Sequence, residues 1–68
     1  MLMPVVNHIR EIRQARDISI QRLAKRLCVD RSSIYCWERQ DYQPQLEQVF
    51  WLLRELDCKF AELFTWTP

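Results

Sequence analysis

Apolar residues recur at helical spacing over residues of about 19–39, in two sets separated by a short interruption. The first set is Leu23, Ala24 and Leu27, and the second is Ile34 and Trp37. Residues three or four positions apart lie on the same side of a helix, so each set forms one apolar face. Val29 falls in the interruption. The pattern predicts two short amphipathic helices joined by a tight turn.

The rest of the chain shows the same period. We expect further helices over residues of about 5–16, 45–56 and 60–64, followed by a short tail at 65–68. The chain has no glycine, and its prolines stand only at positions 4, 44 and 68, so helices are interrupted by few breakers. Ser19 and Asp30 are the expected N-caps of the two central helices. The sequence therefore predicts an all-α fold of five helices in a single domain, residues 1–68.

Five residues of the second central helix point away from its apolar face: Arg31, Ser32, Tyr35, Cys36 and Arg39. Two short helices across a tight turn are typical of the helix-turn-helix, whose second helix lies in the major groove of DNA. Arginine is suited to two hydrogen bonds with guanine. We therefore interpret Arg31, Ser32, Tyr35 and Cys36 as contacts to bases. The alternatives are a solvated polar face and, for Cys36, a redox switch whose modified thiol disturbs the interface.

Candidate phosphate contacts surround this helix: Gln21, Arg22, Arg39 and Tyr42. Gln21 and Arg22 fall in the first turn of the preceding helix, where free backbone N–H groups also attract an anion. Each residue alone is equally compatible with an ordinary polar surface. Together they form a ring around the proposed base-reading helix.

The charge is small in total but unevenly distributed. The formal net charge is +1. Residues 1–40 contain eight Lys/Arg and four Asp/Glu, whereas residues 41–68 contain two Lys/Arg and five Asp/Glu. The basic half contains the two central helices. This distribution suits a protein with one face that contacts phosphate and a second face that contacts a different partner.

Several function classes lack the residues they need. Cys28, Cys36 and Cys58 are isolated thiols, and His8 is the single histidine, so we expect no metal site, no cofactor and a reducing cytoplasm. No apolar run approaches the roughly 20 residues of a membrane span. Without glycine there is no Gly-rich phosphate loop, and one histidine offers little for nucleophilic catalysis. We expect no enzymatic activity.

Several short segments resemble the phage repressor and Cro family, the Xre-type helix-turn-helix regulators, over residues of about 9–64. They are Ile-Arg-Glu-Ile-Arg (9–13), Leu23-Ala24, Arg-Ser-Ser-Ile (31–34), Trp-Glu-Arg (37–39), Pro44, Leu46-Glu47 and Ala-Glu-Leu-Phe (61–64). The resemblance implies a compact, lambda-repressor-like domain of five helices that binds a near-palindromic operator as a homodimer. It also implies a partly buried ion pair between Arg13 and Glu38, which orients the base-reading helix.

The chain departs from the family pattern at four positions. Cys28 and Gln40 stand where family members commonly have glycine, so these turns are either strained or built differently. Ile20 replaces a glutamine that often holds a phosphate, and Asp41 stands where basic residues are common. These differences bear on how phosphate is held rather than on the fold.

The C-terminal half is rich in aromatic residues. Trp51 lies opposite the centre of a broad apolar stripe on the expected helix at 45–56, which is made of Leu46, Val49, Phe50, Leu52, Leu53 and Leu56. An exposed tryptophan favours a partner or a covering tail. Since family dimers often meet through this half, we expect Trp51, Phe60 and Trp66 at a dimer interface. Packing of Trp66 within its own chain is equally compatible with the sequence.

Two functions from different classes remain. We expect a sequence-specific transcriptional regulator, a homodimeric repressor in the cytoplasm of a prokaryotic cell or encoded by a phage, controlled in part by an antagonist protein. The rival is a protein-interaction module on a helix-turn-helix fold, such as an antitoxin or anti-repressor partner. A steep fall of DNA affinity with salt distinguishes the first from the second.

Overall fold

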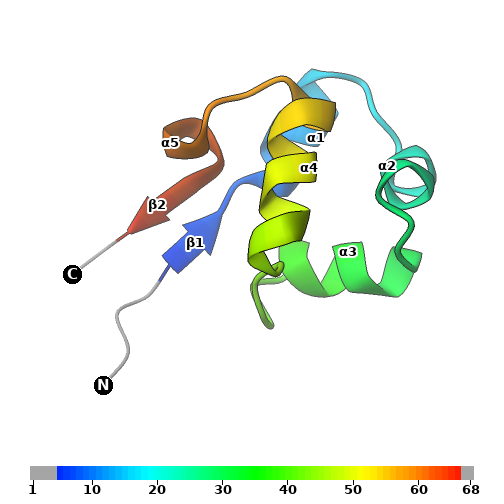
Figure 1. The fold of residues 1–68 in the computed structure, drawn as a ribbon, viewed down its shortest axis with the longest axis horizontal. Coiled ribbons are helices and arrows are strands. Elements are labelled where there is room, and N and C mark those ends of the chain that lie inside the picture. Colours follow the sequence, from blue (N-terminus) through cyan, green and yellow to red (C-terminus); the bar gives the residue numbers. More distant parts are fainter. Residues whose placement is uncertain (1–4, 67–68) are drawn as a thin grey trace.

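The computed structural model describes residues 5–66, which form five helices and one small sheet. In chain order the elements are β1 (Val5–Asn7), α1 (Ile9–Ala15), α2 (Ile20–Leu27), α3 (Arg31–Glu38), α4 (Leu46–Leu56), α5 (Phe60–Leu63) and β2 (Phe64–Trp66). Helix α4 lies in the middle of the molecule, with α2 on one side and with α5 and the sheet on the other (Figure 1). Helix α3 runs along the lower end of the molecule in this view.

The sheet makes the prediction of an all-α fold wrong. Val5 was expected in the first turn of a helix, but β1 pairs antiparallel with β2, and Val5 lies opposite Trp66. The backbone N–H of His8 extends this pairing by donating to the Leu63 carbonyl over 2.8 Å. Local periodicity carries no sign of a strand partner so distant along the chain. Residues 65 and 66 of the expected tail therefore belong to β2, while residues 67 and 68 lie outside the described residues.

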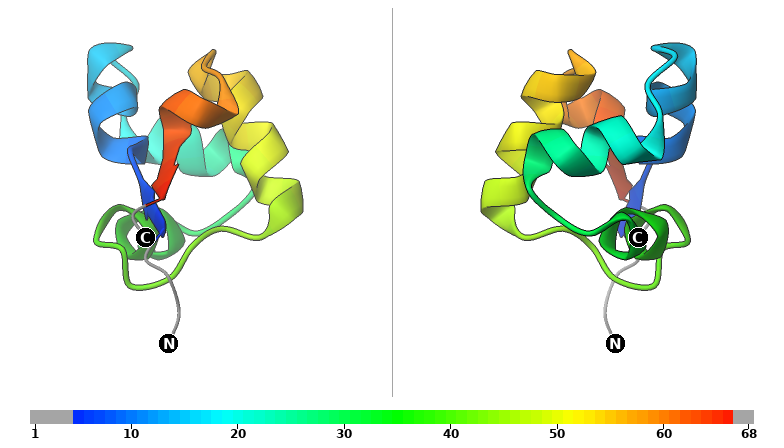
Figure 2. Two further views of the ribbon diagram at one scale, coloured as in Figure 1. Left: turned by 90° about the vertical axis from the view of Figure 1, so that its left-hand side faces the viewer. Right: turned by 90° about the vertical axis from the view of Figure 1, so that its right-hand side faces the viewer.

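The apolar faces of the helices meet in one core. Its buried members are Ile9, Leu23, Ala24, Ile34, Trp37, Leu52, Leu56 and Leu63. Trp37 is the largest of them and is 1 % exposed. Leu27 and Val29 are partly buried against this core, which holds α2, the turn and α3 together. In the left view of Figure 2, α2 lies behind and between α1 and α4, with α3 beneath.

The broad apolar stripe expected on α4 is buried along only part of its width. Val49, Leu52 and Leu56 face the core, whereas Leu46 is 71 % exposed and Phe50 is 65 % exposed. The core is narrower than the stripe because α4 has neighbours on only part of its circumference. Large apolar side chains consequently remain at the surface.

Four helices are followed by a residue in the left-handed backbone conformation, which glycine favours, although the chain has no glycine. The residues with positive φ among those described are Asp17, Cys28, Gln40 and Asp57. After α3, for example, Gln40 N–H donates to the Trp37 carbonyl and Asp41 N–H to the Cys36 carbonyl, each over 3.0 Å. This is the Schellman arrangement, which satisfies carbonyls at the end of a helix. The left-handed conformation costs a non-glycine residue roughly 1–2 kcal/mol.

The two expected N-caps behave differently. Ser19 Oγ accepts a hydrogen bond from Arg22 N–H over 3.0 Å, as predicted. Asp30 is the N-cap of α3, as predicted, but its side chain makes no capping bond; its backbone carbonyl accepts from Ser33 N–H. The Asp30 side chain is exposed.

Candidate nucleic-acid interface

Helix α3 is anchored by one face and leaves the other open. Ile34 and Trp37 are 0 % and 1 % exposed and hold the helix against the core. Arg31, Ser32 and Tyr35 are exposed, and Tyr35 retains 51 % of its surface. Three of the four expected base contacts thus lie on one accessible face. Their contact with bases stays a prediction.

Cys36, the fourth expected base contact, is half-buried. Its sulfur lies 3.6 Å from Arg39 Nη2. A side chain so placed can meet DNA only where the duplex approaches the helix closely. Cys36 therefore stands at the edge of the exposed face of α3 rather than in its centre.

A nearly buried ion pair fixes the C-terminal end of α3 to α1. Arg13 Nε lies 2.8 Å from Glu38 Oε2, and Arg13 Nη2 lies 3.3 Å from Glu38 Oε1. The two side chains are only 11 % and 6 % exposed. Arg13 Nη1 also donates to the Ile18 carbonyl over 3.0 Å. This two-bond geometry sets the direction of α3 as well as its distance from α1.

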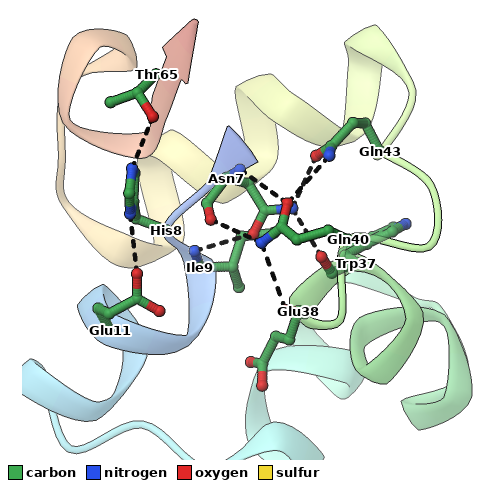
Figure 3. Close-up of polar contacts among 9 residues, drawn as sticks. All are labelled: Asn7, His8, Ile9, Glu11, Trp37, Glu38, Gln40, Gln43 and Thr65. Atoms are coloured by element: carbon green, nitrogen blue, oxygen red, sulfur yellow. Dashed lines mark hydrogen bonds and ion pairs between the residues drawn. The ribbon is translucent and has the colours of Figure 1, made fainter. Parts of the chain in front are cut away.

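A cluster of side-chain amides holds the same end of α3 to β1 (Figure 3). Asn7, 1 % exposed, donates from Nδ2 to the Trp37 carbonyl over 2.8 Å and to Gln43 Oε1 over 2.7 Å. Its Oδ1 accepts from Ile9 N–H over 3.2 Å. Gln40 accepts from Asn7 N–H and donates to the Asn7 carbonyl, over 3.1 and 2.9 Å. Every polar atom of the buried Asn7 side chain is thus satisfied.

Sequence reasoning missed this amide cluster. Asn7 fell inside an expected helix. Asparagine and glutamine side chains are uncharged and follow no periodic pattern here, so the sequence gives little indication that they meet. The one available sign was Gln40, a non-glycine residue at a position where glycine is common in similar proteins. Its side-chain bonds to β1 explain how this turn is built.

The expected phosphate contacts on α2 are both exposed. Gln21 and Arg22 lie in the first turn of that helix, as predicted. The backbone N–H of Arg22, however, is already bonded to the Ser19 side chain. An anion at this end would therefore meet the Arg22 guanidinium rather than its amide. Tyr42, in the loop after α3, is 52 % exposed.

Arg39 is exposed but paired. Its Nη2 and Nε lie 2.7 and 3.0 Å from Asp41 Oδ2. The hydrogen bond and charge of Asp41 raise the pKa of Arg39 above its ordinary value. Such an exposed pair is weak, and a phosphate can replace the carboxylate. Asp41 therefore offsets part of the positive charge at this end of α3.

A cleft of about 280 Å³ between α1, α2 and α3 adds two residues that sequence reasoning missed. Arg10 and Gln14, both exposed on α1, line it together with Tyr35 and Arg39. Arg10 lies three positions before Arg13 and therefore on the same side of the helix, so helical spacing could have indicated that it belongs to this site. Apart from the Arg13–Glu38 ion pair, which also lines the cleft, two guanidinium groups and a phenol are present, and these suit a phosphate group.

The expected interface aromatics do not form one surface. Trp51 lines a groove with Leu27 and Cys28, on the side of α4 that faces α2. Phe60 lines a different groove, between β1, α4 and α5, and Trp66 lies in β2. All three remain exposed, by 46 %, 56 % and 59 %. Their role in a dimer stays a prediction. A single interface on the side of the sheet could include Phe60 and Trp66 but not Trp51.

Two further properties concern metal and membrane sites. Within residues 5–66, no group of three or more His, Cys, Asp or Glu side chains is placed to hold a metal ion. No helix in that range is long and apolar enough to cross a membrane. The three cysteines are free. Burial, followed by the charge of Glu62, raises the pKa of the Cys58 thiol.

The comparison with known families agrees with this geometry. A family model described as "Helix-turn-helix" matches residues 9–63. The chain belongs to this Xre/Cro-like helix-turn-helix family. A search of the curated proteins finds no match. Membership in the helix-turn-helix family makes the chain a DNA-binding regulator in general terms, and the match spans α1 to α5.

Proposed function

We propose that this helix-turn-helix protein is a transcriptional repressor that binds a near-palindromic operator as a homodimer. Helix α3 serves as its recognition helix. The observation that carries this proposal is the division of α3 into a buried face, held by Ile34 and Trp37, and an exposed face with Arg31, Ser32 and Tyr35. A helix held this firmly can carry side chains into the major groove in a defined direction.

The residues at the exposed start of α3 have distinct roles in this proposal. Arg31 reads guanine through two hydrogen bonds, which is worth about 1–3 kcal/mol of discrimination against other bases. Ser32 contacts a neighbouring base edge. Tyr35 and Cys36 follow one turn later, where Tyr35 meets a thymine methyl or the sugar-phosphate backbone and Cys36 permits close approach.

Phosphates are held on both sides of the recognition helix. Gln21 and Arg22 contact one strand from the start of α2. On the other side, Arg39 exchanges Asp41 for a phosphate, and Tyr42 joins it. Arg10 contributes from the cleft between α1 and α3. Phosphate contacts of this kind position the protein without reading sequence.

The proposal also covers cofactor use, catalysis, location and control. The protein acts without a cofactor and without catalysis, in the cytoplasm of a prokaryotic cell or of a phage-infected one. Its activity is set by concentration, by dimerisation and by an antagonist protein. Occupation of the operator is then sufficient for repression.

The test combines a salt series with two arginine variants. The parent is expected to bind random duplex DNA with a linear fall of log affinity against log salt, because each phosphate contact releases counterions. Arg31→Ala should weaken binding to an operator selected from a random pool about tenfold or more. Arg54→Ala, an exposed arginine on α4, is the matched control and should change little. Absence of binding at low salt contradicts the proposal.

A second candidate function is favoured by the exposed apolar side chains of α4, α5 and the sheet. Leu46, Phe50 and Trp66 are each more than half exposed, which is typical of a surface that meets another protein. In this second function the protein binds another protein instead of DNA, in the role of an antitoxin or anti-repressor partner. The same salt series decides between the two functions.

A further inference from the structure

The Arg39–Asp41 ion pair lies at the C-terminal end of α3, next to the face that the proposed function turns toward DNA. Arg39 Nη2 lies 2.7 Å from Asp41 Oδ2 and 3.6 Å from Cys36 Sγ. The guanidinium thus lies along α3, at the edge of its exposed face. It also lines the cleft of about 280 Å³ with Arg10 and Tyr35. A negative charge therefore stands beside a surface that needs positive charge to bind phosphate.

This pair does little for the fold. It joins residues two positions apart, so it links no two elements, whereas the Arg26–Glu55 pair joins α2 to α4. The side chains of Arg39 and Asp41 are 65 % and 48 % exposed, and exposed pairs contribute little to stability. Asp41 also follows the C-terminal end of α3, where the helix dipole disfavours a negative charge. Stability therefore does not explain a carboxylate at this position.

The geometry of the pair allows a phosphate to take the place of the carboxylate. Arg39 Nε and Nη2 both bond to one oxygen, Asp41 Oδ2. The nearly buried Arg13–Glu38 pair instead uses both carboxylate oxygens. Solvent reaches the Arg39–Asp41 pair, and a phosphate offers the guanidinium equivalent acceptors. Arg39 consequently stays available to DNA although it is paired.

The backbone keeps Asp41 at the interface after such an exchange. Its N–H donates to the Cys36 carbonyl over 3.0 Å. The preceding residue, Gln40, is bonded through its side chain to both backbone groups of Asn7 (Figure 3). The freed carboxylate therefore remains beside the bound phosphate. A negative charge in that place holds a cation that the phosphate would otherwise release.

We propose that Asp41 is an internal counter-ion for Arg39, which makes the phosphate contact of Arg39 nearly independent of salt. An ordinary phosphate contact releases cations condensed on DNA, and each steepens the fall of log affinity against log salt by about 0.9. At Arg39 this release is offset by the cation that Asp41 takes up. Asp41 thus lowers the affinity for DNA at low salt and makes binding change less with ionic strength. The inference rests on the proposed DNA-binding function and adds a residue that sets its salt response.

The first test compares the parent with Asp41→Asn on one random DNA duplex, by fluorescence anisotropy over a salt series. Asparagine keeps the size of the side chain and removes its charge. The variant should bind more tightly at low salt, with a slope of log affinity against log salt that is steeper by about 0.9. Its advantage over the parent should shrink about 3.5-fold between about 50 and 200 mM salt, which is the change that this slope difference gives.

Two controls separate this effect from a general change of net charge. Glu62→Gln makes the same change of charge on α5, which lies away from α3 (Figure 1). Glutamine keeps an acceptor for the Lys59 N–H, which Glu62 bonds over 2.8 Å. Asp41→Glu retains the negative charge beside Arg39. Both controls should show a slope close to that of the parent.

The second test asks whether the effect acts through Arg39. Arg39→Ala is made in the Asp41→Asn background. It should return the slope to that of the parent, because it removes the phosphate contact whose cation release was no longer offset. A double variant with a slope as steep as that of Asp41→Asn overturns the internal counter-ion.

The outcomes distinguish this inference from the proposed function. Equal slopes for the parent and Asp41→Asn, or the same steepening in Glu62→Gln, overturn the internal counter-ion while the parent still binds DNA. A parent that binds no duplex at low salt overturns the DNA-binding function and this inference together. Circular dichroism checks that each variant is folded.

Discussion

The turn before α3 and the turn after it have the same left-handed backbone but different side-chain surroundings. Cys28, before the helix, has φ 57° and is exposed. Gln40, after it, has φ 66°, and its amide bonds both backbone groups of Asn7. The chain has no glycine, so both turns bear the cost of the left-handed conformation. Backbone hydrogen bonds close both turns, but only the residue at the second turn adds side-chain hydrogen bonds. The two ends of α3 are therefore held very differently.

This difference suits the proposed function. The C-terminal end of α3 is fixed by the Arg13–Glu38 pair and by Asn7, while its N-terminal end carries Arg31 and Ser32 into solvent. In helix-turn-helix proteins the N-terminal residues of the recognition helix contact the base edges. Substitutions at the anchored end should affect stability, and those at the free end should affect it little or in the opposite direction.

The largest effect is expected at the ion pair of the anchored end. Arg13→Ala should lower the free energy of unfolding by about 3 kcal/mol, because the nearly buried Glu38 carboxylate loses its partner. Urea denaturation measures this change. Arg10→Ala, an exposed arginine one turn earlier on α1, should change stability by less than about 0.5 kcal/mol. An Arg13→Ala variant that melts like the parent contradicts an anchoring role.

The amide cluster should rank next. Asn7→Ala leaves the Trp37 carbonyl and Gln43 without their donor in a buried place, at a cost of about 2 kcal/mol. Asn7→Asp keeps the side-chain volume but cannot donate when ionised, so thermal denaturation at neutral pH should show it destabilised too. Stability equal to that of the parent in the aspartate variant shows that volume, not the donor, matters.

At the turn after α3, two opposing terms meet. Gln40→Gly relieves the left-handed backbone but removes the bonds to Asn7, and we expect a net loss of about 1 kcal/mol. Gln40→Ala loses the same bonds without the relief and should be less stable than the glycine variant by about 1 kcal/mol. Chemical denaturation of both variants separates the two terms. If the Gln40→Gly variant is more stable than the parent, the hydrogen bonds of the Gln40 side chain to Asn7 do not stabilise this turn enough to offset its backbone cost.

The turn before α3 should give the smallest change, with the opposite sign. Cys28→Gly should raise the free energy of unfolding by about 0.5–1 kcal/mol, since relief of the backbone outweighs the extra freedom of glycine in the unfolded chain. Cys28→Ala is the control for loss of the thiol and should resemble the parent in a thermal melt. If Cys28→Gly and Gln40→Gly destabilise the protein equally, the two turns do not differ in the way proposed.

Much of the helical core was predictable because its signal is local. The spacing of Leu23, Ala24, Ile34 and Trp37 marks buried faces that the structure confirms. The exposed face of α3 follows from the same period. The sheet was not predictable, since β1 and β2 come from opposite ends of the chain and each has only three residues. No periodic pattern can establish itself over so short a strand.

The amide cluster illustrates a second kind of limit. Asn7, Gln40 and Gln43 are uncharged and follow no pattern, and Asn7 is more than 30 positions from the other two. Their function appears only when β1 is laid beside the end of α3 (Figure 3). The pairing of Arg39 with Asp41 is different, because it joins residues two positions apart, and it alters what the charge of Arg39 offers to a phosphate.

The amino-acid sequence by itself determined the helices, their apolar faces and the polar face of α3, because these depend on a repeat of three to four residues. Tertiary structure alone decided the sheet, the amide cluster beside β1, and the anchoring of one end of α3. Those features depend on which distant backbone and side-chain groups meet, and each buried polar group among them is tolerable only because its partner arrives from elsewhere in the chain.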